Sequence, residues 1–355
     1  MNKLEEARLA INSIDKEMAE LFEKRMQAVE DVVNYKMENK MQVLDASREK
    51  EIIKRNVEYI ENEDYQEYYL KLFDKMLELS KTYQRRIINK DKIAYQGVEG
   101  AFAHQASIEL FPDSKHLNFA SFEEVIKAVE NGEVKYGVLP YENSYTGEVG
   151  EVSDLLRDHE VYINQVYDLK ISQNLIGLHG SKISEIKEVY SHPQALKQSA
   201  KYLSGRDIEI KPYANTALAA KFVKESNDKT KAAIASVKTA SLYDLEVLEA
   251  DIQTSSSNTT RFIVISKDLK PEGNHFQIIF DVLNETGTLA SAINLIAEYN
   301  LNMVSIKSRS IPKKPWEYYF QVEIEGNLHG ENEQELISKL AKKCTFIKML
   351  GSYNR

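Results

Sequence analysis

Glycine and proline are both absent from the first 96 residues of this 355-residue chain. All 14 glycines and all 7 prolines come later, beginning with Gly97. Since these two residue types most often interrupt helices and form tight turns, a long stretch without them favours continuous helix. Apolar residues recur there at a spacing of three to four positions, as at Leu4, Ile11, Met18 and Val33. The spacing predicts one amphipathic helix of about 35 residues.

Two further helical stretches, around 46–60 and 64–86, complete this first block. A helix as long as the first cannot bury its apolar stripe alone, so we expect an intertwined all-α homodimer or a higher homo-oligomer. The stripe also carries Arg25, and Lys36 follows three turns later on nearly the same face. A buried cation costs several kcal/mol unless an anion compensates it. Either interhelical ion pairs or an anionic ligand would satisfy these cations.

The composition excludes several classes of protein. The formal net charge is −9, from 46 Lys and Arg against 55 Asp and Glu, which argues against a general nucleic-acid binder. The single cysteine, Cys344, excludes an internal disulfide framework and is typical of a reducing cytoplasm. The chain has no apolar run long enough to span a membrane, no His/Cys cluster with metal-ligand spacing, and no dinucleotide or P-loop fingerprint. We therefore expect no membrane partner, no metal and no cofactor.

From Lys92 onward the pattern changes to short strand-like runs that alternate with helical segments. The runs are 92–95, 136–139, 189–190, 232–235 and 261–265, and the helical segments include 122–131, 194–203 and 216–225. This alternation predicts an α/β domain over 92–268, with ligand contacts in loops at the ends of strands. A linker containing Pro271 and Gly273 follows. Residues 275–355, which we call the tail, are predicted to form a small α+β unit in the order βαββαβ.

The helical block carries an ordered set of polar positions: Arg8, Arg25, Lys36, Asp45, Arg48, Glu49, Ser80 and Gln84. This set resembles the site of the all-helical chorismate mutase family, and the resemblance covers residues 1–88. It implies that Arg25, Arg48 and Arg8 of a partner subunit hold the two carboxylates of chorismate. It also implies that Lys36 and Gln84 contact the ether oxygen and that Glu49 contacts the ring hydroxyl. Because the rearrangement of chorismate to prephenate is pericyclic, it requires only conformer selection and stabilisation of the charge on the ether oxygen.

Three strings of the middle block place polar groups at ends of predicted elements. Glu142-Asn-Ser144 ends a strand, Ser191-His-Pro-Gln opens a helix that Ser191 could cap, and Thr259-Thr-Arg-Phe enters a strand. Each string by itself is also explained by capping or by a structural ion pair. Together and in this order they resemble the prephenate dehydratase family, whose domain is a two-lobed α/β fold with its site in the cleft.

That resemblance implies that prephenate loses CO₂ and its ring hydroxyl to give phenylpyruvate. Thr260 is the expected donor to the departing hydroxyl, and Glu142 is the competing acid if burial raises its pKa. The residues expected to position prephenate are Asn143, Ser144, Ser191, Gln198 and Arg261.

The tail resembles an ACT regulatory domain, as found after prephenate dehydratases. The resemblance implies that L-phenylalanine is the effector and that it binds residues of two segments, Gly287, Thr288 and Leu289, and Ser308 and Arg309. A purely structural or dimerising tail is the alternative. For the whole chain, we expect a bifunctional enzyme of phenylalanine biosynthesis. The alternative is a non-catalytic amino-acid-binding sensor whose middle domain is similar to periplasmic binding proteins.

Overall fold

The computed structural model describes residues 2–39, 41, 46–255, 257–311, 314 and 316–355, and gives only the backbone for 46–50. The chain divides into two compact units. The first contains Met1–Lys90 with Asn131–Glu133, and the second contains Asp91–Glu130 with Val134–Arg355. Apart from 131–133, the family resemblance of the helical block and that of the middle block therefore fall on different units.

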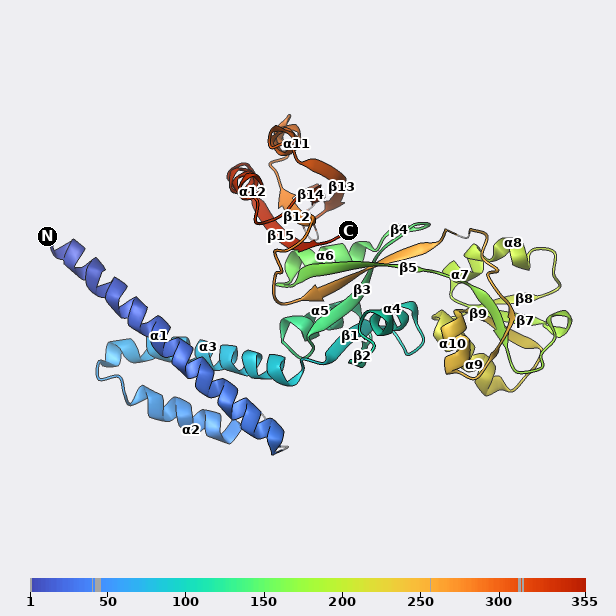
Figure 1. Ribbon diagram of the computed structural model, residues 1–355, viewed down its shortest axis with the longest axis horizontal. Helices are drawn as coiled ribbons and strands as arrows, with labels where there is room; N and C mark the ends of the chain where they lie inside the picture. The colour runs from blue at the N-terminus through green and yellow to red at the C-terminus, as the bar shows by residue number, and fades with distance from the viewer. Residues whose placement is uncertain (1, 40, 42–45, 256, 312–313, 315) are drawn as a thin grey trace. The chain divides into compact units, whose positions relative to one another are not determined.

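The first unit is helical, as the sequence predicts. Its helices are α1 (Lys3–Glu38), α2 (Ala46–Val57) and α3 (Glu63–Ile88) (Figure 1). A capping box between Asn2 and Glu5 starts α1, because each side chain accepts the backbone N–H of the other residue. Every residue from Asn2 to Lys24 is exposed, including the apolar stripe of the first half of α1. Within the described residues, nothing of this chain covers that stripe.

The second unit contains two sheets. The first sheet has the strand order β13-β14-β12-β15-β5-β11-β3-β1-β2, with β4 paired to β3, and the second has the order β10-β6-β9-β7-β8. The strands that precede the tail are β1 (Lys92–Gln96), β2 (Lys115–Phe119), β3 (Tyr136–Asn143), β4 (Gly147–Glu148), β5 (Tyr162–Lys170), β6 (Asn174–Gly177), β7 (Glu188–Ser191), β8 (Glu209–Pro212), β9 (Lys231–Ala235), β10 (Glu246–Glu249) and β11 (Thr259–Ser266). The helices of this region are α4 (Phe102–Leu110), α5 (Phe122–Glu130), α6 (Gly150–Asp158), α7 (Pro193–Gln198), α8 (Ala200–Leu203), α9 (Thr216–Ser226) and α10 (Val237–Leu242).

These elements form two lobes, each with its own apolar core. The first lobe consists of β1–β5 and β11 with α4–α6, and its sheet buries apolar side chains on both faces. The second lobe consists of β6–β10 with α7–α10 around them (Figure 1). The chain passes between the lobes twice, before β6 and after β10. The predicted two-lobed α/β arrangement is therefore present.

The tail has the predicted order βαββαβ. Its elements are β12 (His275–Asp281), α11 (Thr288–Glu298), β13 (Asn302–Ser310), β14 (Tyr318–Glu325), α12 (Glu331–Lys343) and β15 (Phe346–Tyr353). Strand β15 pairs in parallel with β5 at Gly351 and Ile163, so the tail strands continue the sheet of the first lobe. A Cβ at Gly351 would collide with the Ile163 backbone, which explains why glycine occupies this crossing.

Some elements differ from the sequence prediction. Strand β5 has nine residues and lies between β11 and β15, yet its polar Asn164, Gln165 and Asp168 hide the usual alternation of a strand. The single helix predicted over 194–203 is two helices, because Ser199 interrupts it. Strands β2, β4, β6, β8 and β10 are also absent from the predicted set, since they are short or lie at sheet edges.

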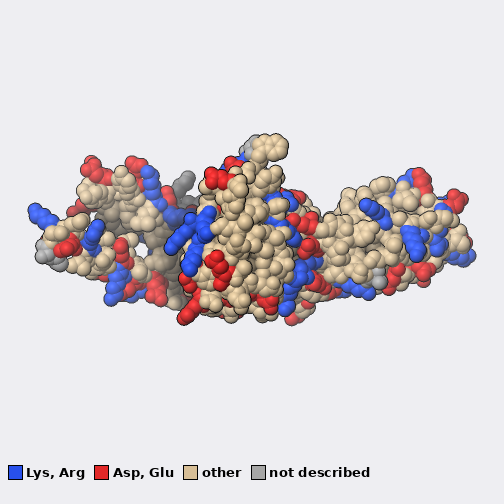
Figure 2. Space-filling model, turned by 90° about the horizontal axis from the view of Figure 1, so that it is seen from above, with Lys and Arg blue, Asp and Glu red and all other residues tan. Residues whose placement is uncertain are grey.

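Charged side chains of both signs are interspersed on the face shown in Figure 2, without one continuous basic surface. None of the helices within the described residues combines the length and apolar character needed to cross a bilayer. Helix α1 has the length to cross a bilayer but not the apolar character, because charged side chains are interspersed with apolar ones along its exposed surface.

Candidate active sites

In the helical unit, Arg25 of α1 contacts Ser80 of α3. The Arg25 Nη1 group donates to Ser80 Oγ, and Ser80 Oγ donates to the Met76 carbonyl at 2.7 Å. Ser80 is buried, and burial lowers the pKa of the Arg25 guanidinium, which nevertheless stays charged at neutral pH. Among the described residues, no carboxylate lies within ion-pair distance of Arg25. A half-buried cation of this kind is suited to bind an anion.

The other residues predicted for the mutase site differ in burial, and some are not described by the structure. Gln84 lies one turn beyond Ser80 on α3 and is half-buried. Lys36 is half-buried in the last turn of α1, whereas Arg8 is exposed in the first half of that helix. Asp45 lies outside the described residues, and the side chains of Arg48 and Glu49 do so as well. The structure thus brings together Arg25 and Ser80, with Gln84 next along α3.

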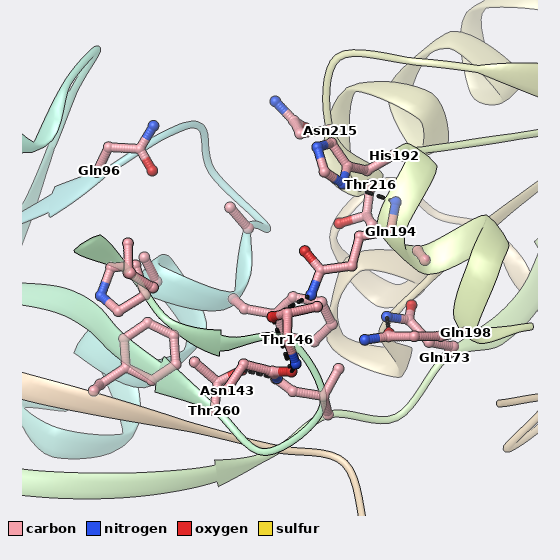
Figure 3. Close-up of a pocket in the computed structure, with 18 of the residues that line it drawn as sticks. Gln96, Asn143, Thr146, Gln173, His192, Gln194, Gln198, Asn215, Thr216 and Thr260 are labelled. Carbon is pink, nitrogen blue, oxygen red and sulfur yellow. Dashed lines mark hydrogen bonds between the residues drawn. The ribbon is translucent and has the colours of Figure 1, made fainter. Parts of the chain in front are cut away.

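A cavity of about 300 Å³, which we call the interlobe cavity, lies between the two lobes of the second unit (Figure 3). The carboxyl ends of β1, β3 and β7 supply part of its lining, where α/β folds usually bind ligands. Its polar lining residues are Gln96, Asn143, Thr146, Gln173, His192, Gln194, Gln198, Asn215, Thr216 and Thr260. None of the described residues that line it is Asp, Glu, Lys or Arg.

Asn143 and Thr260 face each other across paired strands at the end of the cavity formed by the first lobe (Figure 3). The Asn143 Oδ1 atom accepts the backbone N–H groups of Tyr145 and Thr146, at 3.0 and 3.1 Å, which fixes the orientation of the amide. Its Nδ2 group therefore faces Thr260 and donates to Oγ1 at 2.9 Å. Because Asn143 supplies the hydrogen of this bond, the hydroxyl hydrogen of Thr260 is available to another acceptor.

Helix N-termini also reach the cavity. Ala101 and Val149 line it, and they are the N-cap residues of α4 and α6, where neither provides a side-chain cap. The first backbone N–H groups of a helix have no partner within the helix, and the helix dipole favours negative charge at this end. The lining therefore favours an anionic ligand although it contains no Lys or Arg.

The structure places only some of the predicted prephenate residues in this cavity. Asn143, Gln198 and Thr260 line it. Ser191 does not, because its buried hydroxyl donates to the Ile234 carbonyl at 2.6 Å. Ser144 does not either, since its hydroxyl contacts the backbone of Ser257 and Thr259 outside the cavity.

Glu142 and Arg261 lie on the face of the sheet away from the interlobe cavity. The pairing of β3 with β11 shifts register between Arg261 and Phe262, so Tyr141 is an extra residue on β3 and turns with Glu142 to the far side. Glu142 Oε1 there meets Lys307 Nζ of the tail at 3.2 Å. The expected acid is therefore separated from Thr260 by the sheet itself.

Arg261 forms a two-pronged ion pair with Asp168 of β5. Its Nε and Nη2 groups donate to the two carboxylate oxygens at 2.8 and 2.9 Å. The bond with Asp168 raises the pKa of Arg261, and the bond with Arg261 lowers the pKa of Asp168. Strand alternation turns Arg261 away from the cavity that Thr260 and Phe262 line.

Sequence reasoning missed several lining residues, chiefly His192 and the amides Gln173 and Gln194. Gln194 Nε2 donates to Thr146 Oγ1 at 3.3 Å and so bridges the lobes, while Gln173 Nε2 donates to Gln198 Oε1 at 3.2 Å. The Ser-His-Pro-Gln string already contained His192 and Gln194, and a helix start at Pro193 makes the preceding residue the cap. Among the described residues, no group of three or more His, Cys, Asp or Glu is placed to hold a metal ion.

The predicted effector residues of the tail lie in two places. Gly287 has a φ of 84° at the start of α11, where Thr288 Oγ1 donates to the Leu283 carbonyl at 2.6 Å. Leu289 packs against the tail core, and Ser308 is exposed on β13. Arg309 instead contacts α6 of the first lobe, where its Nε and Nη2 groups donate to Asp154 at 2.9 and 2.7 Å.

We expect the Asp154→Asn substitution to lower the free energy of unfolding of the second unit by about 1–3 kcal/mol at pH 7. Asp154 also accepts the Tyr319 hydroxyl at 2.7 Å. Burial favours the neutral acid, but the bonds from Arg309 and Tyr319 outweigh it and leave the pKa of Asp154 below its usual value. The contribution is therefore present above the unfolded-state pKa, about 3.9, and is lost as the pH falls through the lower folded-state value. Urea unfolding at several pH values should show the difference from wild type shrinking below about pH 4.

Asp158→Asn is the matched control for this prediction. Asp158 is on the same helix, but its side chain is 56% exposed, and its ion pair among the described residues is with the neighbouring Arg157. It should change stability by less than about 0.5 kcal/mol. Equal effects of the two substitutions would show that the contact between Arg309 and Asp154 contributes nothing specific.

Comparison with known proteins decides the family. The prephenate dehydratase family model matches residues 93–270, and the chorismate mutase type II model matches residues 7–85. A bifunctional chorismate mutase/prephenate dehydratase from Buchnera aphidicola subsp. Acyrthosiphon pisum (strain APS) is 31% identical, over 97% of this chain and 94% of its own. One from Aquifex aeolicus (strain VF5) is 32% identical, over 99% and 98%. The chain belongs to the bifunctional chorismate mutase/prephenate dehydratase family.

Solved structures agree with this family for the second unit. The prephenate dehydratase from Staphylococcus aureus subsp. aureus Mu50 is 26% identical and covers 74% of this chain and all of its own, with a TM-score of 0.65. A prephenate dehydratase in complex with L-Phe from Arthrobacter aurescens shares the fold, with 22% identity, 74% and 90% coverage and a TM-score of 0.69. The predicted enzyme with both activities is confirmed, and the non-catalytic sensor is not favoured.

Proposed function

We propose that the two activities of this family reside in separate parts of the chain. The mutase site belongs to the helical block 1–88, the dehydratase site is the interlobe cavity of 92–268, and the tail is an ACT regulatory domain. The observation that carries the proposal is the pair of Asn143 and Thr260. Its geometry leaves the Thr260 hydroxyl hydrogen free in a cavity that no Asp, Glu, Lys or Arg of the described residues lines.

In the mutase site, we assign Arg25, Arg48 and Arg8 of a second subunit to the two carboxylates of chorismate. Lys36 and Gln84 stabilise the charge on the ether oxygen, and the remaining residues of the set, Asp45, Glu49 and Ser80, complete the polar wall. The geometry of Arg25 supports this assignment, since it is half-buried, bonded to the neutral Ser80 and still charged. The site needs no nucleophile and no proton relay, because the rearrangement is pericyclic.

The mutase site is built between two copies of the chain. The exposed apolar stripe of α1 supports this, because residues such as Leu4, Ile11 and Met18 are each about half exposed in the single chain. A second α1 laid along the stripe would bury them and bring Arg8 of one copy near Arg25 of the other. We propose a homodimer as the smallest active form.

In the dehydratase site, Thr260 donates a hydrogen bond to the hydroxyl that leaves the ring of prephenate. The bond from the ring to its carboxylate breaks, and that electron pair enters the ring as CO₂ departs. The ring carbon opposite then releases its hydroxyl, which leaves as water after taking a proton from solvent. The interlobe cavity suits this reaction because it offers a donor for the leaving oxygen and the N-terminal ends of α4 and α6, which no side chain caps, for carboxylates. Glu142 has no part in the step, since it faces the tail.

Phenylalanine is the proposed effector of the tail, with Gly287, Thr288, Leu289 and Ser308 around it. The start of α11 supports this, since Gly287 allows a close approach of the backbone. Arg309 transmits the effect rather than binding the effector, because it already holds Asp154 of α6. We also propose a cytoplasmic location, which the single cysteine supports.

A time course with chorismate and no cofactor tests the proposal. We expect chorismate to fall, prephenate to rise transiently and phenylpyruvate to accumulate faster than without enzyme. Added L-Phe should slow phenylpyruvate formation and leave prephenate to accumulate. Prephenate accumulating without phenylpyruvate, in the absence of L-Phe, would contradict the dehydratase assignment. An unaltered rate at millimolar L-Phe would contradict the effector assignment alone.

A further inference from the structure

His192 occupies the position that the sequence pattern gave to Ser191. It is the N-cap residue of α7, directly after β7, with Pro193 as the first helical residue. Its Nδ1 atom accepts the backbone N–H of Gln194 at 3.3 Å. A ring nitrogen that accepts a hydrogen bond carries no proton, so in the neutral ring the proton is on Nε2. The cap thus fixes His192 as a hydrogen-bond donor through Nε2.

The ring of His192 is open to the interlobe cavity. It lies beside Asn215 and Thr216, at the start of α9, on the wall formed by the second lobe (Figure 3). Partial desolvation lowers the pKa of His192, and no charged side chain contributes to the shift. Among the described residues that line the cavity, His192 is the sole titratable side chain with a pKa in the physiological range. It therefore acts as a neutral donor near neutral pH.

The shape of prephenate allows its two ends to contact the two walls of the cavity. Its hydroxyl and its pair of acidic substituents are on opposite carbons of one six-membered ring. Thr260 and Asn143 come from the first lobe, whereas His192 and the start of α9 come from the second. A substrate whose hydroxyl meets Thr260 therefore directs its carboxylates toward His192.

We propose that His192 binds the substrate directly, donating from Nε2 to the carboxylate of the pyruvyl side chain. This inference rests on the dehydratase activity and names the residue that orients its substrate. The pyruvyl carboxylate keeps its charge throughout the reaction, whereas the ring carboxylate leaves as CO₂. A contact to the retained carboxylate is equally strong in the ground state and the transition state, so its loss raises KM and leaves kcat nearly unchanged.

Two substitutions separate substrate binding from helix capping. Asparagine at 192 keeps an oxygen that can accept the Gln194 N–H, as a good N-cap does, but has no donor at the distance of Nε2. Glutamine is a poor cap but places an amide N–H near the position of Nε2. The variant that keeps a donor near Nε2 should therefore keep dehydratase activity, whereas the variant that caps α7 should keep thermal stability.

We expect H192N to raise the KM for prephenate about tenfold or more, with kcat within about threefold of wild type. H192Q should keep KM within about threefold and melt at a lower temperature. The inhibition constant of phenylpyruvate, which retains the pyruvyl carboxylate, should rise in H192N by the same factor as KM. Mutase activity should be equal in all three proteins, which checks the first unit. Equal far-UV circular dichroism at the assay temperature checks that the second unit is folded.

The opposite pattern would overturn the proposal. If H192N keeps the wild-type KM and the wild-type inhibition constant of phenylpyruvate, and H192Q loses activity together with stability, His192 is a helix cap only. If H192N lowers kcat at unchanged KM, the residue acts on the departing groups instead of the retained carboxylate. Isothermal titration of phenylpyruvate into the same proteins measures the contact without turnover, so it separates this inference from a failure of the dehydratase assignment itself.

Discussion

Replacing Thr260 by alanine is expected to lower kcat for phenylpyruvate formation by about 10²- to 10³-fold, with KM for prephenate nearly unchanged. The reason is that Thr260 meets the leaving hydroxyl, whose negative charge develops only as the bond to the ring breaks. The fold should survive the change. The Nδ2 group of Asn143 keeps two other acceptors, Asn258 Oδ1 at 3.0 Å and the Thr259 carbonyl at 3.2 Å.

Two further substitutions make this prediction specific. Thr260→Ser keeps the hydroxyl and should stay within about tenfold of the wild-type rate. Thr259→Ala is the matched control, since the hydroxyl of Thr259 donates to the Ser257 carbonyl at 3.3 Å and Thr259 does not line the cavity. Steady-state kinetics with prephenate measure all three. A Thr260→Ala enzyme with unchanged kcat would exclude Thr260 as the donor.

Replacing Arg25 by alanine is expected to lower mutase activity by at least about 10²-fold and leave dehydratase activity unchanged. Arg25 is partly desolvated and bonded to Ser80, so its substitution removes a positioned cation from the site. Arg8→Ala should have a comparable effect, although Arg8 is exposed in the single chain, because we assign it to the site of the partner. Both rates are measured on the same preparations, with chorismate and with prephenate.

Mixing the two inactive variants tests the shared site directly. After complete chain exchange, half of the dimers contain one chain of each kind, and each of these has one intact site and one that lacks both arginines. Mutase activity should therefore return to about a quarter of the wild-type value. Lys24→Ala is the matched control for Arg25→Ala, since Lys24 precedes Arg25 on α1 and is exposed. It should leave mutase activity unchanged. No recovery, with exchange verified by sedimentation of labelled chains, would show that each site belongs to one chain.

The sequence predicts the elements that neighbouring residues determine, but not those that depend on contacts between distant segments. The three helices of the first unit, to within about three residues at their ends, and the βαββαβ order of the tail follow from local spacing, and the structure has them. Strand β5 was missed although it lies between β11 and β15, because its polar residues lack the alternation that marks a strand. Its place in the sheet comes from pairing partners that are distant in sequence.

The interlobe cavity illustrates the same division at the level of single residues. Asn143, Gln198 and Thr260 were predicted from their strings and line it. Glu142 and Arg261, taken from the same strings, do not, because an extra residue in β3 and strand alternation turn them to the other face. A short sequence motif does not show where the pairing register of two strands shifts. Such a shift moves side chains from one face of the sheet to the other.

By itself, the sequence determined the class of each block, the family and the chemistry that its polar residues suit, since periodicity and motif order are properties of neighbouring residues. Only the tertiary structure decided which side chains meet. It turned Ser191 into the core and opened His192 to the cavity, and it joined Arg309 to Asp154 and Lys307 to Glu142 across more than 150 residues of chain. These contacts depend on strand register and helix capping, which are fixed only when distant segments pack together.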